Sequence, residues 1–385
     1  MNITCDEISD DVDLLKLMMA DQKVADSLYR PTQYWSYYER KILPELLTIG
    51  LKDIHNRPNS KLRVFLGHQT LPHMVNIELN LIRLISNKFT RTIPGWQTFL
   101  NVLSKLIGKS LDTLPVSLAY NVTVKDIQLL SFYFAEALGR ERGARPLRNI
   151  EMSIASNPAD IFVVDGKKYN YKFLQHYIQY TYIAQSIDFN DVNVIVELGS
   201  GFGSQAEVFK KVNRNVSLLL FDIVPQLYVA EQYLKATFPK DIVSYRETRE
   251  LSSLHDIESG KIYILGSWQT PMLRKFKYDL FVNSRSFAEM EPDVVRNYLS
   301  IVSNGARAVY IMSQIGGMRL SRGKNDLGVL ERVNWSDYEK ELSQKFNMIS
   351  KKPFFLPAQP SMRKQHGNDM RGAVLNDALW IRKTD

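Results

Sequence analysis

The sequence contains little cysteine, no long apolar run and no block of like charge. Its single cysteine, Cys5, excludes a disulfide within the chain and favours a reducing compartment. No apolar stretch approaches the ~20 residues that a membrane-spanning helix needs. The acidic N-terminal segment MNITCDEISDDVD lacks the basic and apolar parts of a secretion signal. We therefore expect a cytoplasmic protein.

Positive charge is in mild excess and is dispersed along the chain. The formal net charge is +8 over 385 residues, and the basic residues are scattered singly and in short groups. Such a surface suits nucleic acid, a nucleotide-sugar or a phospholipid-linked glycan, or no anionic partner at all. The length predicts about two domains, each with its own core.

One glycine-rich stretch organises the rest of the chain. Residues 194–197 (VIVE) form a short apolar run that predicts a buried strand, and Gly199, Gly201 and Gly203 follow it. A helical pattern begins directly afterwards. Strand, glycine turn and helix open a nucleotide-binding βαβ unit. Glycine is expected there because a ligand must lie against the backbone, where a Cβ would collide with it.

Two carboxylates indicate which ligand this turn takes. A dinucleotide site would have its third glycine where this chain has Ser204, and an acid, Glu197, stands just before the turn. A second acid, Asp222, ends the next apolar run and is placed to accept hydrogen bonds from ribose hydroxyls. This pattern favours S-adenosylmethionine, with Glu197 orienting the cationic methionine end. A turn with no ligand, or with a nicotinamide cofactor, is the alternative.

Alternating strands and helices predict the fold around this turn. We expect a doubly wound, Rossmann-like methyltransferase sheet of α/β class in residues 151–385, finished by an antiparallel C-terminal edge. A mainly helical domain, residues 1–150, precedes it as a lid, substrate or oligomerisation domain. Pro44 is expected to divide one of its helices, and a hairpin is expected around the Asp165-Gly166 turn.

The carboxyl ends of parallel strands meet at one edge of the sheet, where ligands bind. There we expect Trp268 or Gln269 near the adenine and Asn283 near the methionine end of the donor. The predicted donor-binding residues are Glu197, Gly199, Ser200, Gly201, Gly203, Asp222, Ile223, Trp268, Gln269 and Asn283. The predicted acceptor-binding residues are Arg285, Ser286, Gln314 and His366.

Three segments, IVELGSGFGS, FDIVPQLYVAEQYLKATFP and DLFVNSRSFAEM, resemble the bacterial sugar O-methyltransferases of the type found in nanchangmycin biosynthesis. The resemblance covers roughly residues 169–314, with YRPTQYW as weaker support upstream. It implies S-adenosylmethionine as methyl donor and a sugar hydroxyl as acceptor, in surface-polysaccharide or glycosylated-metabolite biosynthesis. The family's glycine stretch more often reads GGGYGG, where this chain has GSGFGS, and the region around His366 has no match.

Methyl transfer to a sugar hydroxyl requires a base near the donor methyl group. Glu289, just past the fourth strand, is the first candidate, and an exposed acid stabilised by a helix dipole is the alternative reading. His255, in a polar loop, is the second candidate, although a solvated loop histidine explains it as well. No tight His/Asp spacing predicts a metal site.

Other functions remain open from the sequence. Methylation of base amino groups usually brings an Asn/Asp-Pro-Pro-aromatic turn, where this chain has Asn283-Ser284-Arg285-Ser286. Methylation of cytosine carbon needs a cysteine, and Cys5 is far from the predicted site, so nucleic acid is disfavoured as a partner. Methylation of RNA ribose or of another small molecule, and a non-catalytic methyltransferase-like binding subunit, remain the alternatives. A homo-oligomer is compatible with all of these.

Overall fold

The computed structural model describes residues 8–54, 57, 60, 124–155, 157–158, 160–323, 325–356 and 375–384. His366 and part of the predicted helical domain, residues 61–123, lie outside these ranges. Among the described residues, no helix has both the length and the apolar character that crossing a membrane would require.

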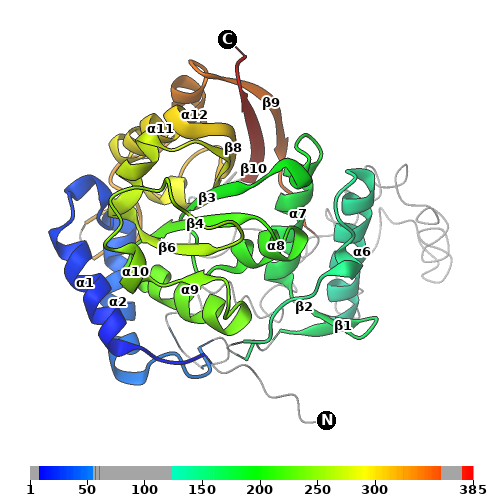
Figure 1. The fold of residues 1–385 in the computed structure, drawn as a ribbon, viewed down its shortest axis with the longest axis horizontal. Helices are drawn as coiled ribbons and strands as arrows, with labels where there is room; N and C mark the ends of the chain where they lie inside the picture. The colour runs from blue at the N-terminus through cyan, green and yellow to red at the C-terminus, as the bar shows by residue number, and fades with distance from the viewer. Residues whose placement is uncertain are drawn as a thin grey trace.

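An eight-stranded sheet in the order β5-β6-β4-β3-β7-β8-β10-β9 forms the centre of the protein (Figure 1). Strands β3 to β8 run parallel, whereas β10 is antiparallel to both of its neighbours. The strands are β3 (Val194–Leu198), β4 (Ser217–Asp222), β5 (Ile242–Val243), β6 (Ile262–Gly266), β7 (Tyr278–Ser284), β8 (Ala306–Gln314), β9 (Phe346–Pro353) and β10 (Leu375–Arg382). The predicted doubly wound sheet with an antiparallel C-terminal edge is confirmed.

Helices cover both faces of the sheet. Alternate residues of the central strands point to opposite sides, so that Ile195 joins one buried cluster and Val196 the other. The first cluster includes α7, α8 and α9, and the second includes α11 and α12. The helices are α1 (Val12–Val24), α2 (Gln33–Ile49), α6 (Val124–Glu141), α7 (Tyr171–Ala184), α8 (Ser204–Val212), α9 (Val224–Thr237), α10 (Tyr245–Thr248), α11 (Pro292–Gly305) and α12 (Trp335–Leu342).

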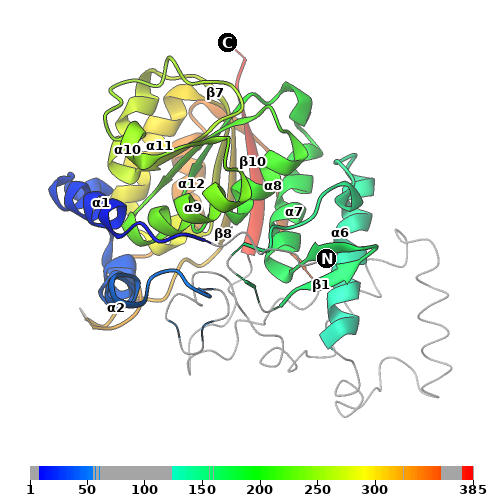
Figure 2. The same cartoon turned by 60° about the horizontal axis from the view of Figure 1, so that its bottom comes forward.

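Helices α1 and α2 lie against one end of this layered body, and α6 lies at the other (Figures 1 and 2). Gln22 of α1 is buried and joins three helices. Its Oε1 accepts a hydrogen bond from the backbone N–H of Val224, the first residue of α9, at 2.8 Å, and its Nε2 donates to Glu39 of α2 at 2.6 Å. Buried residues of α1 and α2 share the first cluster. The domain boundary near residue 150 stays a prediction.

Smaller elements complete the fold. The predicted hairpin is present as β1 (Phe162–Val164) and β2 (Lys167–Tyr169). Pro44 does not divide its helix, because α2 continues through it. Short 3-10 helices occur at η1 (Ser27–Tyr29), η5 (Leu147–Asn149), η6 (Phe189–Asp191), η7 (Ser267–Lys275) and η8 (Ser286–Glu289).

Candidate functional site

The glycine turn joins β3 to α8 at the carboxyl edge of the sheet. Gly199, Gly201 and Gly203 all have positive φ, at 79°, 58° and 90°, a conformation that other residues adopt at a cost. A Cβ on Gly199 would lie 2.2 Å from Oγ of Ser286, and one on Gly203 would lie 2.8 Å from Leu234. A Cβ on Gly201 would meet no described atom within 4 Å. Protein packing therefore explains two of these glycines, and Gly201 alone faces open space.

Asp222 ends β4 directly beside this turn. Its Oδ2 accepts a hydrogen bond from the backbone N–H of Gly201 at 2.8 Å, and its Oδ1 accepts one from Ile223 at 2.7 Å. Burial raises the pKa of Asp222 to about 7, although both backbone hydrogen bonds oppose the rise. Each carboxylate oxygen keeps a second lone pair, which leaves it able to accept a ribose hydroxyl. Ser200 is buried in the same turn.

Glu197 is the second buried carboxylate and is only 2% exposed. Within the described part of the chain its Oε2 has no hydrogen-bond partner. Burial raises its pKa well above the ordinary value, and the neighbouring Asp222 adds to the rise, while Lys172 opposes it. An ionised carboxyl at this position needs a cationic or hydrogen-bonding partner.

Two buried amides near the turn were not predicted as functional. Gln205 is in the first turn of α8 and Gln226 is in the first turn of α9. Neither side-chain oxygen nor nitrogen of these two residues has a hydrogen-bond partner among the described residues, and both side chains are buried. An unpaired buried amide is costly. The sequence signal that could have identified them is a glutamine in the first turn of each helix that follows a strand at the carboxyl edge of the sheet.

Three predicted ligand-binding residues make hydrogen bonds within the framework, and their contact with a ligand stays a prediction. Asn283 is fully buried, and its amide donates to the backbone oxygen of Leu198 at 2.9 Å and to Oγ of Ser286 at 2.6 Å. The hydroxyl of Ser286 in turn donates to Leu198. Gln269 accepts from the N–H of Gly266 at 2.9 Å and donates to the backbone oxygen of Thr248 at 2.7 Å. Both amide hydrogens of Asn283 are engaged in the fold.

Trp268 follows β6 and is half-buried. A Cβ on Gly266 would lie 2.3 Å from its ring, and the ring packs edge-on against Tyr245 with centroids 6.0 Å apart. It also lines a surface hollow together with Asp21 and Arg249. Its predicted contact with adenine stays a prediction.

Charged side chains gather beside the end of β7. Arg285 has a positive φ of 74°, an uncommon conformation for a residue with a side chain and typical of functional sites. Glu289 is partly buried, and burial raises its pKa to about 7. The nearby positive charge of Arg285 lowers this pKa, but by less than burial raises it. Lys172 in the first turn of α7 is their neighbour, and burial lowers its pKa to about 7. Two distant parts of the chain, η8 with its N-cap Arg285 and the start of α7, therefore bring these groups together.

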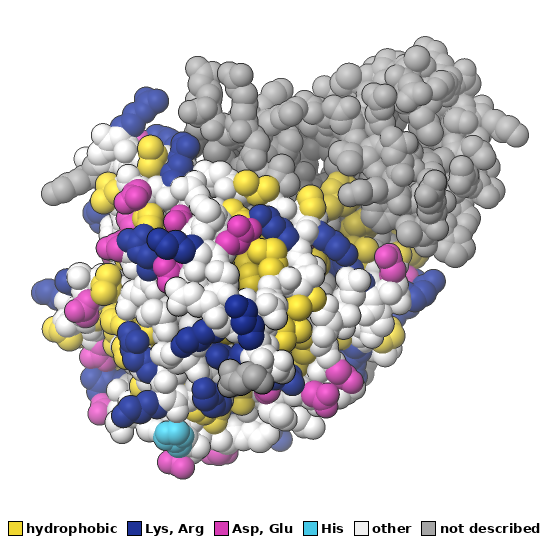
Figure 3. Space-filling view, turned by 90° about the horizontal axis from the view of Figure 1, so that it is seen from above, with side chains coloured by type: hydrophobic (Ala, Val, Ile, Leu, Met, Phe, Trp, Pro, Cys, Tyr) yellow, Lys and Arg dark blue, Asp and Glu magenta, His cyan; other side chains and the backbone are white. Residues whose placement is uncertain are grey.

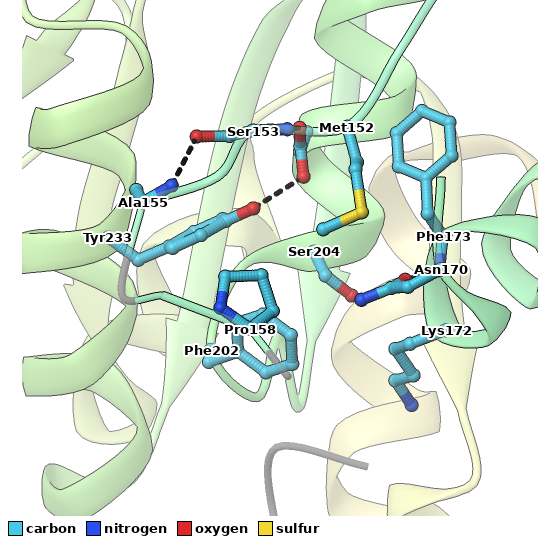
Figure 4. Close-up of a pocket in the computed structure, with 11 residues that line it drawn as sticks. Met152, Ser153, Ala155, Pro158, Asn170, Lys172, Phe173, Phe202, Ser204 and Tyr233 are labelled. Carbon is cyan, nitrogen blue, oxygen red and sulfur yellow. Dashed lines mark hydrogen bonds between the residues drawn. The ribbon is translucent and has the colours of Figure 1, made fainter. Parts of the chain in front are cut away.

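Lys172 also lines a narrow space beside the glycine turn. Asn170 and Phe173 lie next to it, and Phe202 and Ser204 of the turn complete this wall. In Figure 4 the Lys172 side chain points away from the hydrogen-bonded hydroxyl of Tyr233. The hydroxyl of Tyr171, its neighbour in sequence, is buried without a described hydrogen-bond partner. The start of α7 thus presents polar groups toward the carboxyl edge.

The remaining predicted residues lie in different places. His255 is exposed, and its loop is tied to the amino end of β4, because Gly260 donates to Ser217 at 3.0 Å. That edge of the sheet is opposite to Asp222, so the structure does not bring His255 to the candidate site. Gln314 is buried at the end of β8. Among the described residues, no group of three His, Cys, Asp or Glu side chains is arranged to hold a metal ion.

Comparisons with known proteins give only distant similarities. No protein-family model and no curated protein matches this sequence. Among solved structures, a magnesium protoporphyrin IX methyltransferase from Synechocystis PCC 6803 with bound S-adenosylmethionine is 10% identical over 54% of this chain and 78% of its own, with a TM-score of 0.33.

Two further solved structures are similarly distant. A S-adenosylmethionine-dependent methyltransferase from Methanosarcina mazei is 11% identical over 51% of this chain and 94% of its own, with a TM-score of 0.34. An O-methyltransferase family 2 protein from Planctomyces limnophilus in complex with apigenin is 9% identical over 50% of each chain, with a TM-score of 0.33. At these values the activity of this chain has to be argued from its own residues.

Proposed function

We propose that this chain is an S-adenosylmethionine-dependent O-methyltransferase whose acceptor is a sugar hydroxyl. The observation that carries the proposal is the pair of buried carboxylates, Glu197 and Asp222, at the ends of adjacent parallel strands beside a glycine turn. The chain builds the sheet outward from β3 through β4 and β6, and then continues on the other side of β3 with β7. Ligands of open α/β sheets bind at such a reversal.

The charge of this site favours a cationic ligand over a pyrophosphate. A pyrophosphate would add negative charge next to Glu197 and Asp222. The charge of Asp222 already raises the pKa of Glu197, because two neighbouring carboxylates repel each other when both are ionised. The ammonium and sulfonium groups of S-adenosylmethionine would instead offset that charge. They would also give Oε2 of Glu197 the partner that it lacks among the described residues. The unpaired amides of Gln205 and Gln226 offer further donors and acceptors for the same ligand.

A count of charges also supports an uncharged acceptor. When all five groups are ionised, the carboxylates of Glu197, Asp222 and Glu289 face the cations of Lys172 and Arg285, which leaves one excess negative charge among these described groups. S-Adenosylmethionine carries one net positive charge and would balance it. An acceptor without charge at its reacting end keeps the balance, and a sugar hydroxyl meets this condition.

The residues of the chain have two tasks in such a transfer. The bound donor supplies an electrophilic methyl group on a sulfonium leaving group. The protein must hold the acceptor oxygen in line with that methyl, an alignment worth about 7–11 kcal/mol. It must also receive the hydroxyl proton, and we assign this task to Glu289. Its pKa of about 7 suits a base that works near neutral pH.

Calorimetry tests the donor assignment directly. We expect purified protein to bind S-adenosylmethionine and S-adenosylhomocysteine and to show no heat with NADH. Glu197→Gln should weaken S-adenosylmethionine at least about tenfold, a change of ~1.4 kcal/mol. Glu258→Gln, at an exposed acid in the His255 loop, is the matched control. If neither nucleoside binds, the proposal is wrong.

A panel of acceptors tests the second half of the proposal. Labelled methyl from the donor should appear on neutral glycosides or nucleotide-sugars, and not on RNA. On the face shown in Figure 3, Lys and Arg side chains are interspersed with Asp and Glu instead of forming one basic surface. Transfer to RNA ribose, with binding that weakens steeply as salt rises, would replace the sugar assignment.

A further inference from the structure

Helix α2 lies beside Glu289 although more than two hundred residues separate them in sequence. Oγ1 of Thr32, the residue before α2, donates to the backbone oxygen of Glu289 at 3.0 Å. Nε2 of Gln33, the first residue of α2, donates to the backbone oxygen of Gly323 at 3.1 Å. The start of α2 is therefore fixed next to η8 by hydrogen bonds on two sides.

An aromatic cluster occupies the first turns of α2. Trp35 packs edge-on against Tyr34 with ring centroids 5.4 Å apart, and against Tyr38 at 5.8 Å in a tilted arrangement. Tyr34 and Tyr38 also contact each other at 5.3 Å. All three side chains are half-buried. Mutual ring contacts of this kind restrict the rotamer of each member, so the indole ring of Trp35 is held in place.

We propose that Trp35 is the positioning residue for Glu289, and that the aromatic cluster of α2 forms the wall of the acceptor site. The inference rests on the proposed function, because it assigns Glu289 as the base. Trp35 acts by donating its indole N–H to the carboxylate of Glu289, whose backbone oxygen is hydrogen-bonded to Thr32, three residues before Trp35. Indole is a donor only, so it can hold the carboxylate without competing for the proton that the base must receive.

The groups around Glu289 determine what loss of this hydrogen bond does. Arg285 and Lys172 favour its ionised form, and Asp222 opposes it. Burial of the tyrosines Tyr34 and Tyr38 raises their pKa values, so both stay neutral at physiological pH. A donor to a carboxylate stabilises the charged form and lowers its pKa. Removing the indole N–H should therefore raise the pKa of Glu289 and leave its side chain less well oriented.

Trp35→Phe is the variant that tests this role, with Tyr37→Phe as its matched control. Tyr37 lies on the same helix, and its hydroxyl interacts with Lys41, at the surface. We expect Trp35→Phe to lower turnover at least about tenfold and to move the rising limb of the pH profile to higher pH. Tyr37→Phe should leave both unchanged. Trp35→His, which keeps a ring N–H, should restore part of the loss.

A readout without turnover separates this inference from the proposed function. Glu289 can be titrated by infrared spectroscopy of its carboxyl band, identified by its absence from Glu289→Gln. We expect the midpoint to rise in Trp35→Phe and to stay in place in Tyr37→Phe. An equal midpoint in all three proteins would overturn the role of Trp35. Failure to bind S-adenosylhomocysteine would overturn the proposed function and leave this titration interpretable.

Discussion

Asp222 is a carboxyl group whose protonation depends on its surroundings. In the free protein burial raises its pKa to about 7, so the group holds a proton below that pH. A cationic donor favours the ionised form, and its binding must release this proton. Affinity for S-adenosylmethionine should therefore increase as pH rises from 6 to 7 and level off above about 8.

Calorimetry at several pH values measures this dependence. The increase should approach about tenfold per pH unit on the acid side of the pKa. Asp222→Asn, which cannot ionise, should give weaker binding with a flatter profile. Affinity that stays constant, or that falls, between pH 6 and 8 would remove the ligand-binding role of Asp222.

Glu289 gives a second prediction at the scale of one residue. Glu289→Gln should lower turnover by about 10² to 10⁴, the range typical of a lost general base. Affinity for S-adenosylhomocysteine should change little, because the substitution keeps the size of the side chain. Asp293→Asn, at an exposed acid in the first turn of α11, is the control. A fully active Glu289→Gln enzyme would move the role of base to another residue.

The roles of single side chains were only partly predictable. The polar residues at the strand ends could be placed at one edge, because parallel strands in a doubly wound sheet end together. Whether an amide there faces a ligand or the framework depends on partners far away in sequence. Asn283 bonds to Leu198, and Gln269 bonds to Thr248, and neither pairing leaves a sequence pattern.

The glycine turn is the element on which the candidate site is built, and its glycines should respond differently to substitution. Gly203→Ala places a Cβ 2.8 Å from Leu234, whereas Gly201→Ala meets no described atom within 4 Å. In both variants the new alanine must adopt a positive φ, which destabilises the folded state by about 1–2 kcal/mol. We expect Gly203→Ala to lose more stability in urea unfolding, and Gly201→Ala to lose donor affinity with a smaller loss of stability.

The same two measurements on both variants check this prediction. Calorimetry with S-adenosylhomocysteine reports affinity, and the urea midpoint reports stability. The expected result is that the two effects separate between Gly201 and Gly203. Unchanged affinity in Gly201→Ala would mean that the ligand does not approach this part of the turn.

Elements were predictable where burial leaves a clear pattern. Strands β3 and β4 are apolar runs bounded by polar or glycine residues, and both were expected close to their observed positions. The two-residue strand β5 was missed, because so short a segment has no periodicity of its own. The loop of His255 was polar and could have reached either edge of the sheet. In the structure this loop is held at the amino edge of the sheet, because Gly260 donates a hydrogen bond to Ser217 of β4.

A buried acid outside the site should influence the stability of the whole molecule. Asp377 of β10 is 4% exposed, and the hydroxyl of Tyr310 donates to it at 2.5 Å. Burial nevertheless raises its pKa to about 7, against Tyr310 and the charge of Arg142. In the unfolded chain this proton leaves near pH 4. The folded state therefore holds one more proton between about pH 4 and 7, and this group's contribution to stability falls as pH rises through that window.

Asp377→Asn should remove this dependence. We expect the difference in unfolding free energy between pH 5 and pH 8 to shrink by at least about 1.4 kcal/mol, the value of one pKa unit. Asp256→Asn, at an exposed acid, serves as the control. Urea unfolding at the two pH values measures it, and an identical difference in Asp377→Asn and the parent protein would contradict the prediction.

The contact of Gln22 with Val224 bears on how this protein can be dissected. The helix that starts at Val224 follows Asp222 by one residue, so its first N–H groups and the carboxylate share one short stretch of backbone. A recombinant fragment beginning near residue 151 would expose that helix start to water and release the strand end. Neither fragment should be interchangeable with a counterpart from another protein, because the start of α9, two residues after Asp222, is hydrogen-bonded to α1.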